Sequence, residues 1–311
     1  MKNKLKIVFA GTPQFAVPTL EKINNTLFDV VGVLTQPDRK AGRGMRITSS
    51  DVKKFAEKNN LLVMQPVSLN DDVYSMIKHL NADVLVVAAY GLIIPEKFLN
   101  LFKKGSFNVH ASLLPRWRGA APIHSAIESG DSQIGVTIMK VVKMLDAGTM
   151  IKKNSIGLKN NFTTGEMLER LAFMGADLIL DVLKDVSLNK KITYVLQDEE
   201  KVTYANKINK VEANLNLEDS PEKLIRKIRA FNPYPGIKYH FKGKILKIWN
   251  AALFKKIDNI NLKTGDISFI DDKLILVLYN GMIELIELQL EGEKKMQSKY
   301  FIERFKIKKV K

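Results

Sequence analysis

The sequence predicts two domains: a doubly wound, mostly parallel α/β sheet, followed by a small β domain of the barrel type. Over its first two-thirds, the chain alternates short β-branched apolar runs with amphipathic segments of helical period. The last third contains short strand-like runs that are separated by turn signals. A length of 311 residues fits two domains of ordinary size.

The N-terminal elements are predicted from apolar runs without polar alternation, which are typical of strands buried on both faces. The predicted strands are 6–10, 30–34, 62–64, 84–88, 106–110 and 134–141. The predicted helices are 15–23, 52–58, 71–80 and 164–183, the last with Thr164 as its N-cap. This alternation favours a Rossmann-like sheet with helices on both faces.

The pattern changes after Leu188. We interpret residues 189–206 as a linker between an N-terminal domain, 1–188, and a C-terminal domain, 207–311. Ser220 and Pro221 are expected to open a helix that continues to Arg229. The strands expected after it are 238–241, 244–251, 266–270, 273–278 and 281–289. Five short strands with little helix indicate a β-barrel resembling the oligonucleotide-binding (OB) fold.

Composition excludes several kinds of chemistry. The chain has no cysteine, which excludes disulfides, thiolate nucleophiles and Cys-ligated metals. The longest nearly apolar run, 84–94, is too short to span a bilayer. The basic N-terminus is not followed by the apolar stretch of a signal peptide. We therefore expect a cytoplasmic protein that does not associate with membranes.

The charge is unusually basic, with 49 Lys+Arg against 33 Asp+Glu and a net charge of +16. Residues 1–205 hold 27 basic and 20 acidic side chains, whereas residues 206–311 hold 22 and 13 in half the length. A lysine-rich composition alone would spread the charge more evenly. The excess predicts a nonspecific phosphate-binding face on 207–311, although solubility is the alternative explanation.

Two polar side chains carry the strongest chemical signal. Asn108 and His110 are two residues apart on a predicted strand, so they lie on one face near its carboxyl end, where ligands bind in open α/β sheets. An amide can donate to a developing oxyanion and an imidazole can transfer protons, which suits acyl transfer. Taken alone, the pair could instead be hydrogen-bonded only within the fold.

A third residue strengthens the hypothesis that Asn108 and His110 are catalytic. Asp146 follows another predicted strand and could orient His110. The chain has neither cysteine nor a G-x-S-x-G elbow, so no residue is an obvious covalent nucleophile. It also lacks the glycine patterns of dinucleotide-binding and phosphate-binding loops. Direct transfer between two bound substrates is the mechanism that this set of residues favours.

The region around His110 resembles a known family. Asn-x-His, then Ser-Leu-Leu-Pro-Arg-Trp-Arg-Gly-Ala-Ala-Pro-Ile over 112–123, with Asp146 downstream, is similar to the 10-formyltetrahydrofolate-dependent formyltransferases. Segments 9–13, 35–39, 41–44, 89–93 and 229–233 share the resemblance. Within that superfamily, residues 39–44 resemble the enzymes that act on methionyl-tRNA.

The resemblance implies a direct attack on the formyl group of 10-formyltetrahydrofolate by the α-amine of methionine on initiator methionyl-tRNA. The reaction would pass through a tetrahedral intermediate, need no metal and serve translation initiation. Asn108 would stabilise the oxyanion, His110 would help to deprotonate the amine, and Asp146 would orient His110. The residues implied in folate binding are Ser112, Leu113, Leu114, Pro115, Tyr90, Leu92, Ile94, Val141 and Leu145.

The resemblance also gives the basic stretch 36–54 a role, since it would enter the tRNA acceptor stem with Arg43 as the discriminating side chain. The residues implied in tRNA binding are Arg39, Lys40, Arg43, Arg46, Lys207 and Lys210. We expect a monomer.

Two other functions stay open. The chain could formylate a small amine, such as glycinamide ribonucleotide or an amino-sugar nucleotide, but such substrates do not explain the basic loop 39–46. It could also be a non-enzymatic RNA-binding protein on the same scaffold, against which the presence of Asn108, His110 and Asp146 argues.

Overall fold

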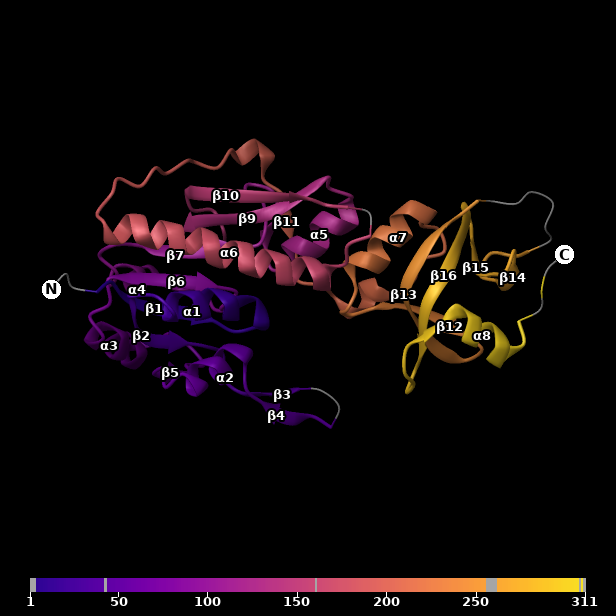
Figure 1. The fold of residues 1–311 in the computed structure, drawn as a ribbon, viewed down its shortest axis with the longest axis horizontal. Coiled ribbons are helices and arrows are strands. Elements are labelled where there is room, and N and C mark those ends of the chain that lie inside the picture. Colours follow the sequence, from indigo (N-terminus) through magenta and orange to yellow (C-terminus); the bar gives the residue numbers. More distant parts are fainter. Residues whose placement is uncertain (1–3, 42–43, 160, 256–261, 308, 310–311) are drawn as a thin grey trace. The chain divides into compact units, whose positions relative to one another are not determined.

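The computed structural model describes residues 4–309 apart from 42–43, 160, 256–261 and 308 (Figure 1). Its contacts divide the chain into two compact units. Unit 1 comprises Met1–Pro122, Gln133–Ile156 and Leu168–Ala205, and unit 2 comprises Ile123–Ser132, Gly157–Met167 and Asn206–Lys311. Each unit is therefore built from three separate segments of the chain, whereas the two predicted domains, 1–188 and 207–311, are each one continuous segment.

Unit 1 is built on a seven-stranded sheet with the order β10-β9-β7-β6-β1-β2-β5. β1 pairs in parallel with β2 and β6, β6 pairs in parallel with β7, and β9 is antiparallel to β7. This confirms the predicted mostly parallel sheet. The strands are β1 (Lys6–Gly11), β2 (Asp29–Leu34), β5 (Val63–Met64), β6 (Val84–Ala88), β7 (Ser106–His110), β9 (Gln133–Lys140) and β10 (Met150–Gly157).

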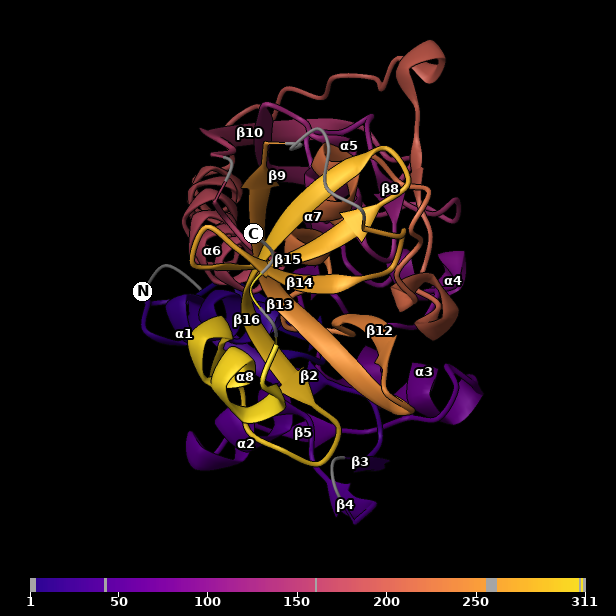
Figure 2. The same cartoon turned by 90° about the vertical axis from the view of Figure 1, so that its right-hand side faces the viewer.

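Helices cover both faces of this sheet, as expected for a doubly wound fold. The short helix η1 (Gln14–Ala16) leads into α1 (Val17–Asn24), and α1 lies on the same face as α2 (Asp51–Lys58) and the long α6 (Thr164–Ser187) (Figures 1 and 2). An ion pair between Lys22 and Asp177 joins α1 to α6. The opposite face carries α3 (Asp71–His79) and α4 (Glu96–Leu99) (Figure 2).

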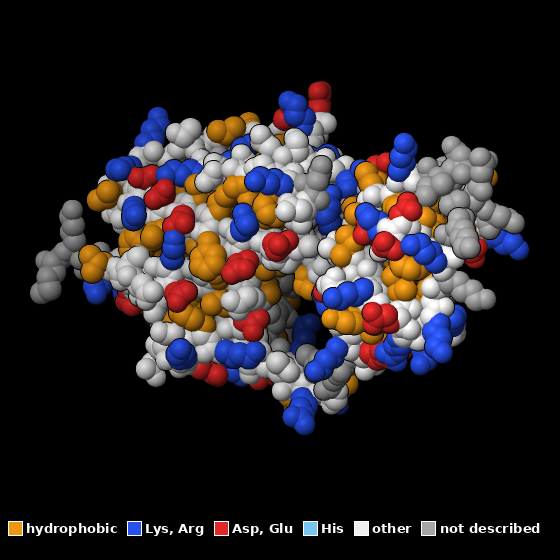
Figure 3. Space-filling model, turned by 45° about the vertical axis from the view of Figure 1, so that its right-hand side comes forward, with side chains coloured by type: hydrophobic (Ala, Val, Ile, Leu, Met, Phe, Trp, Pro, Cys, Tyr) orange, Lys and Arg blue, Asp and Glu red, His pale blue; other side chains and the backbone are white. Residues whose placement is uncertain are grey.

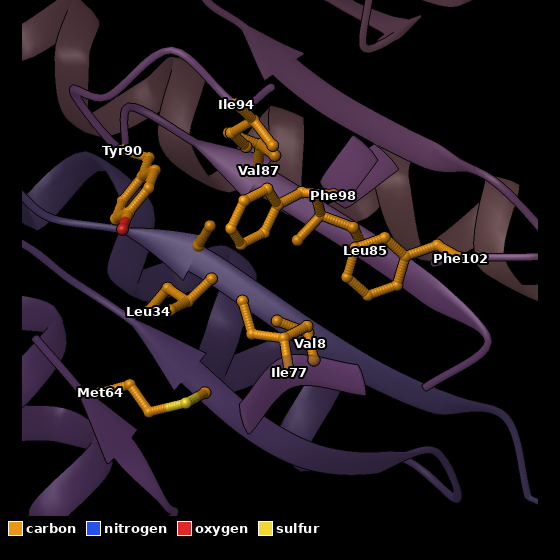
Figure 4. Close-up of a cluster of buried hydrophobic side chains, with 11 residues drawn as sticks. Val8, Leu34, Met64, Ile77, Leu85, Val87, Tyr90, Ile94, Phe98 and Phe102 are labelled. Atoms are coloured by element: carbon orange, nitrogen blue, oxygen red, sulfur yellow. The ribbon is translucent and has the colours of Figure 1, made fainter. Parts of the chain in front are cut away.

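The core under α3 and α4 shows why these segments fold as they do (Figure 4). Alternate residues of β1 and β6 point to this face, where they meet Ile77 of α3 and Phe98 of α4. The buried cluster comprises Val8, Ala10, Leu34, Met64, Ile77, Leu85, Val87, Tyr90, Ile94, Phe98 and Phe102. Each fully buried Val, Leu, Ile, Phe or Met side chain contributes about 1.5–3 kcal/mol to the stability of the fold. The cluster therefore fixes the end of β6, from which Tyr90 and Ile94 extend.

Unit 2 contains an antiparallel sheet with the order β12-β13-β16-β15-β14, and β17 pairs with β16 (Figure 2). Its elements include all five predicted strands and the predicted helix. They are η3 (Lys210–Ala213), α7 (Pro221–Ala230), β12 (Ile237–Phe241), β13 (Lys244–Phe254), β14 (Ile267–Ile270), β15 (Lys273–Leu278), β16 (Gly281–Leu290), β17 (Met296–Gln297) and α8 (Ser298–Phe305). The helix α5 (Pro122–Ser129) contributes to this unit, because Arg226 Nε donates to Glu128 O at 3.0 Å.

Several elements were not predicted from the sequence. In unit 1 these are β3 (Arg39–Ala41), β4 (Arg46–Thr48), α4, β8 (Arg118–Gly119), β10, η2 (Glu199–Lys201) and β11 (Tyr204–Ala205). In unit 2, α5, η3, β17 and α8 were missed as well. Near the C-terminal end of the predicted phosphate-binding region 207–311 lies α8, whose Phe301 packs 5.2 Å from Phe241, measured between ring centroids. In the described part of the chain, no helix is long and apolar enough to cross a membrane.

Candidate active site

The candidate site lies at the carboxyl end of the parallel strands, beside the point where the strand order reverses. The chain passes from β1 outward to β2 and β5, and then returns to the other side of β1 as β6. Such a switch point leaves a crevice at the carboxyl ends of the strands. Here Thr12, which follows β1, donates from its hydroxyl to the carbonyl of Tyr90 after β6 at 2.8 Å.

The structure brings together the three side chains singled out from the sequence. Asn108 Nδ2 donates to Asp146 Oδ1 at 3.4 Å, and Asp146 Oδ2 lies 3.6 Å from His110 Nδ1. The side chains of His110 and Asp146 are largely withdrawn from water, with exposed fractions of 6% and 11%. Asn108 is half-buried and its Nδ2 carries a second hydrogen, which leaves one donor for an incoming oxygen.

The surroundings of His110 determine which ring nitrogen can act as a base. Its Nε2 lies 2.9 Å from the carbonyl oxygen of Trp117. Because a carbonyl can only accept, Nε2 holds the hydrogen of the neutral ring and Nδ1 keeps its lone pair. The carboxylate of Asp146 faces that nitrogen and can stabilise the imidazolium formed when Nδ1 takes a proton.

Asp146 lies in a tight turn between β9 and β10. Its backbone has a φ of 49°, in the left-handed region where Asp and Asn are among the better-tolerated residues. Gly119 N donates to its Oδ2 at 2.9 Å. The turn also requires Gly148, because a Cβ there would lie 1.8 Å from the carbonyl oxygen of Lys140. The backbone thus fixes where the Asp146 carboxylate can lie.

Asn108, His110 and Asp146, which we call the trio, are surrounded by three groups that the sequence did not predict: the Gly119 amide, the Arg118 side chain and the Gln197 side chain. Gly119 and Arg118 fall within the motif of residues 112–123, so the sequence carried a signal for them. Gln197 carried no such signal, because it lies in the polar segment that was interpreted as a linker. Its Nε2 donates to the carbonyls of Asp146 and Gly148, both at 2.8 Å.

The residues expected to contact folate fall in three places. Tyr90 and Ile94 belong to the core cluster at the end of β6, and Leu92 and Val141 pack against it. Leu114 is buried with Met139 and Met150, and Lys153 Nζ donates to its carbonyl at 3.0 Å. Ser112 is buried and donates to Arg116 O at 2.7 Å, and Leu113 and Pro115, beside Leu114, are half-buried. Leu145 is exposed on the Asp146 turn.

Two buried donors at the same end of the sheet, the Tyr90 hydroxyl and Gln36 Nε2, have no hydrogen-bond partner among the described residues. They are linked through Thr12, whose hydroxyl donates to Tyr90 O and accepts from Gln36 N. Burial raises the pKa of Tyr90 to about 12, so its hydroxyl stays neutral and able to donate. Buried polar groups normally have partners, and these two mark the carboxyl ends of β2 and β6 as suited to a polar ligand.

The basic segment of unit 1 forms the hairpin β3–β4, with Arg39 paired opposite Thr48. Arg39, Lys40 and Arg46 are exposed, and Arg39 also donates to Gln36 Oε1 at 2.6 Å. Lys and Arg side chains are visible at the bottom of Figure 3, where this hairpin lies. Arg43, the residue expected to discriminate the tRNA, lies outside the described residues.

In unit 2, Lys207 and Lys210 are both exposed, the latter at the start of η3. Several lysines of this unit lie over aromatic rings, among them Lys295, whose Nζ is 4.2 Å from the ring centroid of Trp249. Among the described residues, no group of three His, Asp or Glu side chains could hold a metal ion.

Comparison with known proteins matches both parts of the chain. Residues 4–183 match the formyl transferase family model, and residues 207–306 match that of the formyl transferase C-terminal domain. A methionyl-tRNA formyltransferase of Coxiella burnetii is 43% identical over 305 residues, covering 96% of this chain and 95% of that protein. One of Methylobacillus flagellatus is 41% identical over 299 residues, covering 96% of each.

Solved structures share the fold at low sequence identity. An N-formyltransferase from Helicobacter canadensis, in complex with folinic acid and dTDP-3-aminofucose, matches with a TM-score of 0.67 at 19% identity, over 90% of this chain and 98% of that one. HypX from Aquifex aeolicus in complex with tetrahydrofolic acid matches with a TM-score of 0.63 at 14% identity. That match covers 99% of this chain, which spans about half the length of HypX. The two domain matches and the close relatives show that the chain belongs to the methionyl-tRNA formyltransferase family.

Proposed function

We propose that this formyltransferase transfers the formyl group of 10-formyltetrahydrofolate to the α-amine of methionine on initiator methionyl-tRNA. The observation that carries this proposal is 41–43% identity to methionyl-tRNA formyltransferases over 96% of the chain. The convergence of Asn108, His110 and Asp146 supports it, because the trio supplies the groups that acyl transfer to an amine needs.

In the proposed mechanism, the amine attacks the formyl carbon and the bond from that carbon to N10 of the folate breaks. The free Nδ2 hydrogen of Asn108 binds the formyl oxygen as negative charge develops on it. His110 Nδ1 takes the proton that the amine loses, and Asp146 stabilises the resulting imidazolium. A proton from His110 can then return to the departing nitrogen, so the protons balance without a metal.

The folate would lie against the apolar surface formed by Leu92, Val141 and the core at the end of β6. The unpartnered Tyr90 hydroxyl and Gln36 Nε2 fit a ligand that brings polar atoms to this surface. The exposed side chains of Met144 and Leu145 on the Asp146 turn would cover its apolar part. Folate would supply only the activated formyl group, and the protein would supply orientation, the oxyanion donor and the base.

A direct test is formyl transfer by the purified chain to methionyl-tRNA, to free methionine, to glycinamide ribonucleotide and to a dTDP-amino sugar. Binding energy from the remote parts of a tRNA should be used at the reacting centre. We therefore expect kcat/KM for methionyl-tRNA to exceed that for each small amine by about 10²-fold or more. A small amine that matches methionyl-tRNA, or an absence of transfer to any acceptor, would refute the proposal.

We also propose that the exposed cations of the β3–β4 hairpin, together with Lys207 and Lys210 of unit 2, contact tRNA phosphates. Arg46 is the most suitable residue to test, because it is exposed and forms no ion pair with any described residue, whereas Arg39 donates to Gln36. Arg43→Ala tests the residue that the sequence singles out.

Arg46→Ala is expected to weaken tRNA binding several-fold and to lower the slope of log affinity against log salt by about 1. Folate affinity should not change, because the substitution leaves the Tyr90 region intact. Binding titrations at several salt concentrations would measure both effects, with Lys78→Ala on α3 as the matched control. Equal loss of folate and tRNA affinity would contradict a tRNA-specific role.

A further inference from the structure

We propose that Arg118 and Gln197 are positioning residues that hold Asp146 against His110. They belong to an arrangement that we name the clasp, defined as Gln197, Glu199, Thr203 and Ala205 together with the segment 117–119 to which these four residues bond. This inference rests on the proposed function, since it assigns a task within the same site. All of its residues belong to unit 1.

The first part of the clasp is a fully buried arginine. Arg118 is 1% exposed and its Nη2 lies 2.7 Å from Glu199 Oε1, with Nη1 3.3 Å from the other carboxylate oxygen. Its Nε donates to Gln197 Oε1 at 2.9 Å. The planar guanidinium therefore binds two side chains in one fixed geometry, which a lysine could not reproduce.

That contact determines how the Gln197 amide is oriented. Because Arg118 Nε can only donate, the amide must present its oxygen to Arg118 and its NH₂ to the opposite side. There Nε2 donates to the carbonyls of Asp146 and Gly148, both at 2.8 Å. Arg118 thus determines, through Gln197, the position of the two peptide groups that flank the Asp146 turn.

The same strand reaches the catalytic groups through its backbone. Trp117 O lies 2.9 Å from His110 Nε2, and Gly119 N donates to Asp146 Oδ2 at 2.9 Å. The two groups therefore come from the residues on either side of Arg118. The segment 117–119, which contains β8, consequently sets both the tautomer of His110 and the direction of the Asp146 carboxylate.

Residues 203–205 in turn hold this strand in place. Thr203 Oγ1 accepts from Trp117 N at 2.9 Å, and Thr203 O accepts from Arg118 N at 2.9 Å. Gly119 has a φ of 119°, and a Cβ there would lie 2.6 Å from Ala205 O. Only glycine lets the two segments approach this closely. Gln197 thus contacts the Asp146 turn, whereas Thr203 and Ala205 contact the residues before and after Arg118.

The Asp146 turn needs such support, because its own backbone bond, from Ala147 N to Met144 O, is long at 3.4 Å. Met144 and Leu145, which precede Asp146, are exposed by 68% and 62%. The distances from Asp146 to Asn108 and His110 are 3.4 and 3.6 Å, longer than strong charge-assisted hydrogen bonds. A carboxylate at such distances is held only weakly by its catalytic partners, so its position depends mainly on Gly119 and Gln197.

The test uses Gln197→Ala and Arg118→Lys, with Asp198→Ala as the matched control. Asp198 neighbours Gln197 and caps η2 by accepting from Glu200 N, and its ion pair is with Lys201 and not with Asn108, His110 or Asp146. We expect kcat for methionyl-tRNA formylation to fall about 10–10²-fold in both clasp variants. KM for 10-formyltetrahydrofolate should stay within about twofold, and Asp198→Ala should keep the wild-type kcat. A clasp variant with wild-type kcat, or an equal loss in Asp198→Ala, would overturn the proposal.

A double-mutant comparison separates positioning from a purely structural role. If Gln197 acts through Asp146, Gln197→Ala should lower kcat by less than about twofold in the Asp146→Asn background. If Gln197→Ala lowered kcat as much in the Asp146→Asn background as in the wild type, Gln197 would act independently of Asp146, and the inference would be overturned.

A readout without turnover keeps the inference testable if the proposed function fails. The His110 ring resonances, followed by ¹³C-histidine NMR, should shift in Gln197→Ala and not in Asp198→Ala. Unchanged His110 resonances in Gln197→Ala would overturn the inference, whatever substrate the enzyme uses.

Discussion

Asn108→Ala is expected to lower kcat by about 10²–10³-fold, the usual cost of removing one oxyanion donor. Within the described part of the chain, the half-buried amide makes only one hydrogen bond, at 3.4 Å to Asp146, so its loss removes little folding energy. We expect the free energy of unfolding to fall by less than about 1 kcal/mol. KM for the folate should change little, because the lost interaction forms as charge develops in the transition state.

Asn108→Asp provides a sharper comparison. The aspartate is isosteric, but it lacks the NH₂ donor and places a second carboxylate next to Asp146. The expected order of kcat is therefore wild type, then Ala, then Asp. Single-turnover formylation assays would measure the chemical step, with thermal melts to confirm folding. Asn59→Ala is the matched control, since Asn59 is exposed and its amide donates to Phe55 O within its own helix turn. Retention of more than about a third of the wild-type rate by Asn108→Ala would exclude the oxyanion role.

The sequence predicted the central strands because they are buried on both faces and show no polar alternation. β6 and β7 were placed correctly, and with them Tyr90, Asn108 and His110 at the carboxyl edge. Edge strand β10 was missed because it carries Lys152 and Lys153 among few apolar residues. An edge strand faces solvent and needs no continuous apolar run, so periodicity does not reveal it.

The clasp could not be inferred from the sequence for a different reason. The roles of Gln197 and Thr203 depend on backbone carbonyls and amides, which every residue has and no pattern reveals. Their segment is polar and aperiodic, and it is held by hydrogen bonds to residues about 80 positions away. The helix α8 could not be inferred either, because its apolar side chains Phe301 and Phe305 pack against Phe241, a distant residue of β12.

Asp146→Asn is expected to have the largest effect, a fall in kcat of about 10³–10⁴-fold with little change in stability. The substitution keeps the size of the side chain and one oxygen that can accept from Gly119 N, and it removes the charge that stabilises the His110 imidazolium. Asparagine also tolerates the φ of 49°. Asp146→Ala adds a backbone cost of about 1 kcal/mol in the left-handed region, so Asn tests the charge and Ala tests charge and turn together.

A control for the backbone is available within the same chain. Asp271 has a φ of 47° in the turn between β14 and β15. Asp271→Asn therefore makes the same substitution at a left-handed backbone position that is not part of the active site. We expect Asp271→Asn to keep the wild-type kcat and melting temperature. If Asp146→Asn also kept its rate while Asp146→Ala lost activity, Asp146 would serve the turn and not the imidazolium. His110 would then act without a carboxylate partner, and the clasp would have no catalytic group to position.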